Sequence, residues 1–133
     1  MSKNTDLIDA AQRVRARAYA PYSNHPVGAA VRDEAGVIHR GCNVENAAYP
    51  EGTCAEAGAI AAMIAAGGRR ITAIAIAGPG SALCTPCGGC RQKIREFSGA
   101  NVPVLIVGID GLIAEFTVGQ LLPDSFGPDN VTP

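Results

Sequence analysis

Residues 54–77 read Cys-Ala-Glu-Ala-Gly-Ala-Ile-Ala-Ala-Met-Ile-Ala-Ala-Gly-Gly-Arg-Arg-Ile-Thr-Ala-Ile-Ala-Ile-Ala, and they decide the fold. The alanine-rich residues 54–66 predict a helix, which the glycines at 67 and 68 end. Residues 71–77 alternate isoleucine with alanine or threonine, and this period of two is typical of a strand. One face of the strand is bulky and the other is small, so we expect a helix to pack closely on it.

Further helices and strands are predicted on both sides of this stretch. Before it come a helix over residues 6–20, with Thr5 as its N-cap, and strands over residues 27–32 and 37–44, joined by a four-residue hairpin loop. After it come a helix over residues 87–97, a strand over residues 104–109, a hairpin at Asp110-Gly111, a strand over residues 112–118, a helical turn over residues 119–122 and a surface tail over residues 123–133.

This order of elements predicts a three-layer α/β fold. The helix between the third and fourth strands requires a crossover connection, so these two strands should be parallel, whereas each hairpin joins antiparallel strands. We therefore expect a five-stranded mixed sheet flanked by helices. The length of 133 residues fits a single domain that covers residues 1–133.

The charge balance argues against polymeric partners. Eleven Lys and Arg stand against twelve Asp and Glu, a formal net charge of −1, so the chain lacks the basic surface that binds nucleic acid or an anionic membrane. No stretch approaches the ~18 apolar residues of a membrane span. Residues 1–6 lack the apolar run of a signal peptide. We expect a cytoplasmic protein with no nucleic-acid partner and no membrane partner.

The chain has five cysteines, and in a reducing compartment this odd number favours metal binding or catalysis over disulfide bonds. Three of them lie in Thr53-Cys54-Ala55-Glu56 and Pro86-Cys87-Gly88-Gly89-Cys90, each at the start of a predicted helix. The Cys-x-x-Cys turn aims two sulfurs at one metal ion, and Cys54 adds a third. Three sulfurs leave the fourth tetrahedral position of zinc open for water, as in a catalytic site. The helix N-termini favour the thiolate form.

Other roles are open for the remaining cysteines and histidine. Cys84 lies three residues before Cys87, so four sulfurs could instead form the closed site of a structural zinc-binding module. Cys42 lies on a predicted strand and is expected to be a small buried side chain. His39 is expected on the surface of the same strand.

Glu56 lies two residues after Cys54, where its carboxylate is placed to carry protons. Zinc can lower the pKa of bound water to ~7, and an adjacent carboxylate can accept its proton and return it to a leaving group. A ligand-x-Glu pattern followed by Pro-Cys-x-x-Cys is the signature of zinc nucleobase deaminases. Thr53 and Glu56 also match a capping box, in which Glu56 would only close the helix N-terminus.

Further motifs narrow the family. They are Pro21-Tyr22-Ser23, Val27-Gly28-Ala29-Ala30, Gly41-Cys42-Asn43-Val44-Glu45-Asn46-Ala47-Ala48-Tyr49-Pro50 and Leu121-Leu122-Pro123-Asp124-Ser125-Phe126-Gly127-Pro128. With them the chain resembles the small, homotetrameric cytidine deaminases over nearly its whole length. The resemblance implies a Zn²⁺ cofactor and hydrolytic deamination of cytidine and 2′-deoxycytidine to uridine and 2′-deoxyuridine, with release of ammonia, in pyrimidine salvage.

The resemblance also assigns roles within the site. Glu56 is the catalytic residue, and Cys54, Cys87 and Cys90 hold the metal. The substrate-binding residues are Asn43 and Glu45 on the ribose hydroxyl, the backbone amide of Ala55 on the pyrimidine carbonyl, Ala47 and Tyr49 in a neighbouring subunit's pocket, and Phe126 stacked on the pyrimidine of another chain. The tail, about residues 123–133, is expected to pack on a neighbouring subunit, so that the sites lie at subunit interfaces.

Two positions depart from the pattern of the family. Many relatives carry an arginine directly after the catalytic glutamate, where it bonds the thiolates, and this chain has Ala57. The helix N-termini or Arg91 are the substitutes that we expect. His25 stands where relatives usually carry phenylalanine, and a histidine ring can still stack on a pyrimidine. We therefore include His25 among the substrate-binding residues.

The rival functions differ in the pocket or in the metal site. A deaminase of a modified cytidine or of an aminopyrimidine nucleoside antibiotic would share the chemistry and differ only in the pocket. A polynucleotide-editing deaminase is disfavoured, because the chain lacks the basic and aromatic groove residues that bind a single strand. A structural zinc-binding module would require the four-sulfur site.

Overall fold

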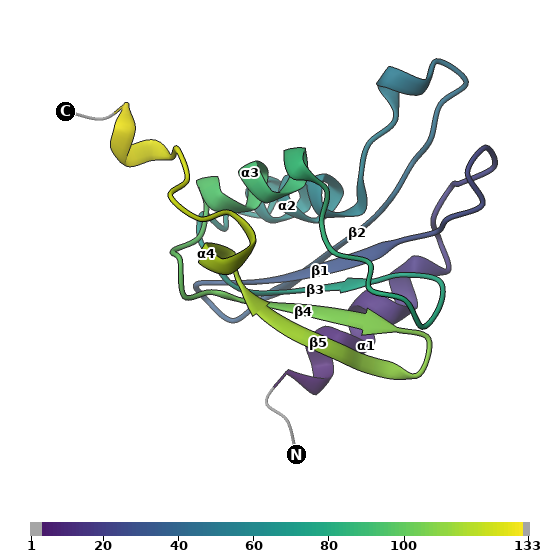
Figure 1. The fold of residues 1–133 in the computed structure, drawn as a ribbon, viewed down its shortest axis with the longest axis horizontal. Helices are drawn as coiled ribbons and strands as arrows, with labels where there is room; N and C mark the ends of the chain where they lie inside the picture. Colours follow the sequence, from purple (N-terminus) through teal and green to yellow (C-terminus); the bar gives the residue numbers. More distant parts are fainter. Residues whose placement is uncertain (1–3, 132–133) are drawn as a thin grey trace.

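The computed structural model describes residues 4–131 (Figure 1). Its elements are α1 (Thr5–Arg15), β1 (Gly28–Asp33), β2 (Ile38–Cys42), a 3₁₀ turn (Tyr49–Glu51), α2 (Ala55–Ala65), β3 (Ile71–Ala77), α3 (Gly88–Glu96), β4 (Pro103–Gly108), β5 (Gly111–Thr117), α4 (Val118–Leu121) and a second 3₁₀ turn (Pro128–Asn130). Within these residues, no helix is long and apolar enough to cross a membrane.

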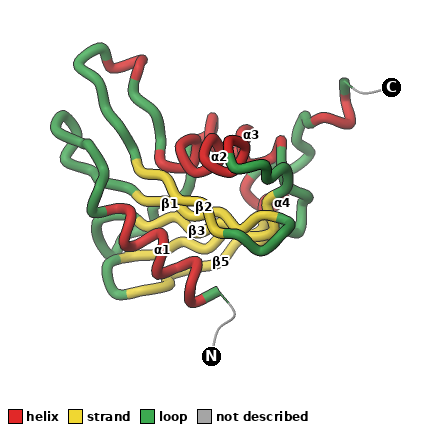
Figure 2. The backbone as a smooth tube through the Cα atoms, turned by 180° about the vertical axis from the view of Figure 1, so that it is seen from behind, coloured by secondary structure: helices red, strands yellow, loops and turns green. Residues whose placement is uncertain are grey.

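The strands form one sheet in the order β2-β1-β3-β4-β5. The pair β3–β4 is parallel, and the other three pairs are antiparallel. Helix α1 covers one face of the sheet, and α2 and α3 lie side by side on the other face (Figures 1 and 2). The predicted three-layer α/β architecture with a five-stranded mixed sheet is confirmed.

The two-residue alternation of β3 divides the core between the two faces. The alanines of β3 pack in one buried cluster with Leu7 and Ala11 of α1. Its isoleucines pack in a second cluster with Ala59 and Met63 of α2. The small face therefore receives α1 and the bulky face receives α2, because successive side chains of a strand point to opposite faces. Gly67, with φ at +100°, ends α2 in the left-handed conformation that favours glycine.

Glycines let both helices approach the sheet closely. A Cβ added at Gly28 would lie 2.2 Å from the carbonyl oxygen of Ala11 in α1. A Cβ added at Gly41 would lie 2.2 Å from the amide nitrogen of Ala59 and 2.5 Å from the carbonyl oxygen of Ala55, both in the backbone of α2. Only a hydrogen atom fits at these positions. Gly41 thus fixes the height of the first two turns of α2 above the sheet.

The N-terminal half departs from the predicted boundaries. The first helix has Asn4, not Thr5, as its N-cap, and it ends at Arg15 instead of residue 20. The chain leaves the helix there because the backbone of Tyr19 pairs with the segment after β2, donating to Asn43 and accepting from Glu45. The same pairing draws residues 43–45 away from the sheet, so the second strand ends at Cys42.

His39 was expected on the surface of the second strand, but it is buried. It is only 8% exposed, not a surface residue, and its Nε2 lies 2.7 Å from Oδ2 of Asp33. The hydrogen bond to His39 lowers the pKa of Asp33, and bonds from the backbone N–H groups of Val37 and Ala35 act in the same direction. A polar ring with such a partner can be buried without an unsatisfied group. Cys42, expected to be buried, is only partly so.

We predict that Gly41→Ala destabilises the fold, because its methyl group would overlap the backbone of α2. The free energy of unfolding should fall by about 1–3 kcal/mol, as in other overpacked cores. Urea unfolding measures the change. Gly99→Ala is the matched control, because a Cβ at that position meets no atom within 4 Å, and its effect should stay below about 1 kcal/mol. Equal stability of the two variants would contradict the close approach.

Candidate metal centre and active-site pocket

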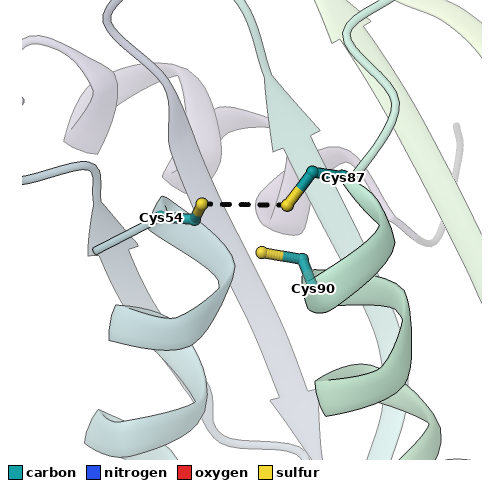
Figure 3. A group of neighbouring side chains, drawn as sticks. All are labelled: Cys54, Cys87 and Cys90. Carbon is teal, nitrogen blue, oxygen red and sulfur yellow. Dashed lines mark hydrogen bonds between the residues drawn. The ribbon is translucent and has the colours of Figure 1, made fainter. Parts of the chain in front are cut away.

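Three cysteine sulfurs converge between α2 and α3 (Figure 3). Cys54 is the N-cap of α2, Cys87 is the N-cap of α3, and Cys90 lies in the first turn of α3. The three sulfur atoms lie within 4.8 Å of one another, and the Cys54 and Cys87 sulfurs are 3.9 Å apart. Within residues 4–131 no other group of three or more His, Cys, Asp or Glu side chains is placed to share one metal ion.

The topology explains why residues 33 positions apart meet here. Helix α2 leads into β3 and α3 follows it, and each helix runs antiparallel to this strand on the same face of the sheet. Both helix N-termini therefore lie at the carboxyl end of β3. Cys54 and Cys87 have extended φ and ψ angles and make no side-chain capping bond, so neither sulfur is engaged in closing its helix.

The donor set fits zinc. Burial raises the pKa of the Cys54 and Cys90 thiols, whereas a backbone hydrogen bond from Cys90 lowers the pKa of Cys87. Burial thus disfavours the thiolate form of two of the three sulfurs. A divalent cation favours the thiolates, and three sulfur donors suit zinc, which binds thiolates in tetrahedral geometry.

The described residues form neither the four-sulfur site nor the capping box that the sequence left open. The Cys84 sulfur lies outside the three-sulfur group and 3.7 Å from Nε2 of His25, so the closed four-sulfur site is absent from the described residues. The capping box is absent as well, because Cys54 caps α2 and the backbone of Thr53 pairs with Val44.

Glu56, only 4% exposed, faces the pocket beside the sulfurs. Burial raises the pKa of its carboxyl.

This pocket has a volume of about 280 Å³. Its lining residues are Ser23, His25, Val27, Asn43, Glu45, Cys54, Ala55, Glu56, Cys84, Thr85 and Cys87. The structure thus brings together seven of the predicted site residues, and Cys90 completes the sulfur group beside them. Ser23, Val27 and Thr85 also line the pocket, and their role in the site was not predictable from the sequence.

Asn43 and Glu45 hold one wall of the pocket in place. The Glu45 carboxylate accepts hydrogen bonds from the backbone N–H groups of Tyr22 and Ser23 and from the Ser23 hydroxyl, and the hydroxyl bond lowers the pKa of Glu45. The Asn43 amide accepts from the N–H of Val27 at 2.8 Å and donates to the carbonyl of His25 at 3.0 Å. Ser23 gives no local signal in the sequence, because its partner is 22 residues away.

Ala47, Tyr49 and Phe126 lie outside the pocket of their own chain. Tyr49 is 75% exposed and Phe126 is 61% exposed, and Ala47 is also exposed. The Tyr49 ring lies 5.8 Å from the ring of Tyr22 at the edge of a second hollow, which Glu45 also lines. Phe126 belongs to the tail that extends beyond α3 (Figure 1), and its carbonyl accepts from Gln92.

Arg91 does not bond the sulfurs. Its guanidinium donates to the carbonyl oxygens of Pro86 at 2.7 Å and Leu121 at 2.9 Å, and to the hydroxyl of Thr85 at 3.3 Å. These bonds tie the loop before α3 to the end of α4. Arg91 therefore makes none of the thiolate bonds expected of an arginine at position 57, although its positive charge stays beside the loop that leads to Cys87.

Both the sequence and the structure are similar to those of known proteins. Residues 1–106 match the family model of the cytidine and deoxycytidylate deaminase zinc-binding region. The chain is 40% identical to a cytidine deaminase of Sporosarcina psychrophila over 126 residues, which cover 95% of this chain and 93% of that protein. The crystal structure of cytidine deaminase from Burkholderia pseudomallei matches with a TM-score of 0.87 at 41% identity, over 95% of this chain and all of that chain. The crystal structure of cytidine deaminase from Mycobacterium tuberculosis matches with a TM-score of 0.81 at 36% identity, over 96% and 99% of the two chains.

We predict that Cys90→Ala loses zinc whereas Cys84→Ala retains it. Removing one of three converging sulfurs should lower the zinc affinity by more than about 100-fold. Cys84 lies outside the group, so its variant should still bind one zinc ion per chain. Metal analysis after dialysis measures both. Loss of zinc from Cys84→Ala would instead support a four-sulfur site.

Proposed function

The chain belongs to the family of zinc-dependent cytidine and deoxycytidylate deaminases, and on this basis we propose its substrates, its site residues and its assembly. The protein is a hydrolase that replaces the amino group of cytidine by oxygen, giving uridine and ammonia. We propose that it also accepts 2′-deoxycytidine and that it serves pyrimidine salvage in the cytoplasm. Its five free cysteines support a reducing compartment.

One observation supports this site above all others: Glu56 lines the same small pocket as Cys54 and Cys87. Zinc held by Cys54, Cys87 and Cys90 would supply the Lewis acidity that activates water. Glu56 is buried beside it with a raised pKa. Its carboxyl can therefore carry the two protons of the water one after the other: the first goes to the ring nitrogen of the pyrimidine, and the second goes to the departing amino group.

The pocket walls offer groups for the nucleoside. The N–H of Ala55 lies in the first turn of α2, where backbone donors have no partner within the helix, so it can donate to the pyrimidine carbonyl. Asn43 and Glu45 carry the polar atoms for the ribose hydroxyl. Each can bind the sugar and the loop together, because an amide and a carboxylate offer several hydrogen-bonding sites. The His25 ring, on the same wall, can stack on the pyrimidine.

We propose a single-domain subunit that assembles as a homotetramer with sites at the subunit interfaces. Tyr49, Ala47 and Phe126 are exposed and lie away from their own pocket. Aromatic side chains such as Tyr49 and Phe126 are enriched in protein–protein interfaces. In a tetramer these residues would complete a neighbour's pocket, and the tail would pack on that neighbour.

We predict metal-dependent deamination of cytidine and 2′-deoxycytidine, with free cytosine spared because it lacks the sugar. Ultraviolet absorbance follows all three substrates in parallel, and a chelator-stripped sample is the control. Glu56→Gln should retain zinc and lose more than about 100-fold in kcat, since its amide cannot carry the proton. Substantial turnover by this variant would remove Glu56 from the proposed role.

We further predict that two impaired variants, Phe126→Ala and Glu56→Gln, restore activity when their subunits mix. Phe126→Ala should lower kcat/KM by about 10- to 100-fold, the cost of a lost base–aromatic stack. Co-expression with Glu56→Gln creates mixed tetramers in which some sites hold Glu56 from one chain and Phe126 from another. Activity above the sum of the separate variants supports shared sites. An active monomer by light scattering would contradict the assembly.

A further inference from the structure

With the proposed zinc ligands and Glu56, the metal site carries an excess of negative charge. Three thiolates and one carboxylate bring four negative charges, against two positive charges on zinc. Ala57, directly after Glu56, adds no charge, and the Arg91 guanidinium is bonded to oxygens around the loop before α3. A further cation close to the sulfurs would offset this charge, which is costly where it is buried, as at Cys90.

The side chain of Lys93 extends back along α3 toward the first turn of the helix. Its Nζ lies 3.8 Å from the position of a Cβ added at Gly89. Gly89 lies one turn earlier, between Cys87 and Cys90. Long side chains in a helix point toward its N-terminus, and here that direction leads to the turn that carries two of the three sulfurs. The absence of a side chain at Gly89 leaves the path of the lysine clear.

The amine of Lys93 is not used elsewhere. Within residues 4–131 it makes no hydrogen bond or ion pair, not even with Glu96 one turn further along α3. Lys93 and Ala57 also line one hollow of about 410 Å³ between α2 and α3. A long side chain at position 57 could therefore occupy the same hollow.

We propose that Lys93 is a positioning residue of the metal site, which offsets the negative charge of the three sulfurs and Glu56 from the α3 side. The proposal rests on the zinc site proposed above. Lys93 acts in this role through its positive charge and does not itself bind the metal. Removing the charge should weaken zinc binding, and restoring a charge in the shared hollow should recover it.

The test is zinc affinity, measured with the full chain by competition against a chromophoric chelator. Lys93→Met should weaken zinc binding by about three- to tenfold at about 0.1 M salt, and the difference should shrink at about 1 M salt, where the Debye length falls from about 10 Å to about 3 Å. Lys93→Arg should bind zinc like the original chain. Lys93→Met combined with Ala57→Arg should recover most of the affinity.

A matched control separates the effect of a charge near the sulfurs from the effect of the net charge of the protein. Arg13→Met removes one positive charge on α1, across the sheet from the sulfurs, and it should leave zinc affinity unchanged. The proposal is overturned if Lys93→Met binds zinc as tightly as the original chain, or if its loss is independent of salt and is not recovered by Ala57→Arg. Failure of the proposed function looks different, because the original chain itself would then bind no zinc or leave cytidine unchanged.

Discussion

The contact between Gly41 and the backbone of α2 is the constraint on which the site depends. A glycine at this point of β2 lets the first turns of α2 rest directly on the sheet. Helix α3 lies beside α2 on the same face, so the height of α2 also sets the separation of the two helix N-termini. Sulfurs can share a metal ion only within a few ångströms. A larger side chain under α2 would lift Cys54 away from Cys87 and Cys90.

How much the sequence could predict depends on where each signal lies. The strand β3, the hairpins, the parallel crossover and the two cysteine motifs were predictable because their signals are contiguous. The end of α1 at Arg15 was not, because it depends on pairing between Tyr19 and the distant residues 43–45. His39 is buried because Asp33, on the neighbouring strand, satisfies its ring. The commitment of Arg91 to Pro86 and Leu121 likewise depends on how α4 packs.

The two side chains that are proposed to bind the sugar, Asn43 and Glu45, also order the pocket wall. Glu45 holds Tyr22 and Ser23, and Asn43 holds Val27 and His25. This arrangement fixes both carboxylate and amide before any ligand arrives, which lowers the entropy lost on binding. A substitution at either position would therefore disturb the loop together with the proposed sugar contact. The identity of such residues can be read from a motif, but their structural role requires the fold.

Burial shapes the electrostatics of the site as much as the number of acidic groups does. It raises the pKa of Cys54, Cys90 and Glu56, since little water surrounds the charge that each would carry. The two helix N-termini act in the opposite direction, but each contributes only about half a positive charge. A full charge placed inside the pocket would take up the space of the substrate. Lys93 avoids this conflict, because it lies in the hollow between α2 and α3 and does not line the pocket. Charge supplied from α3 in this way allows the residue after Glu56 to be as small as alanine.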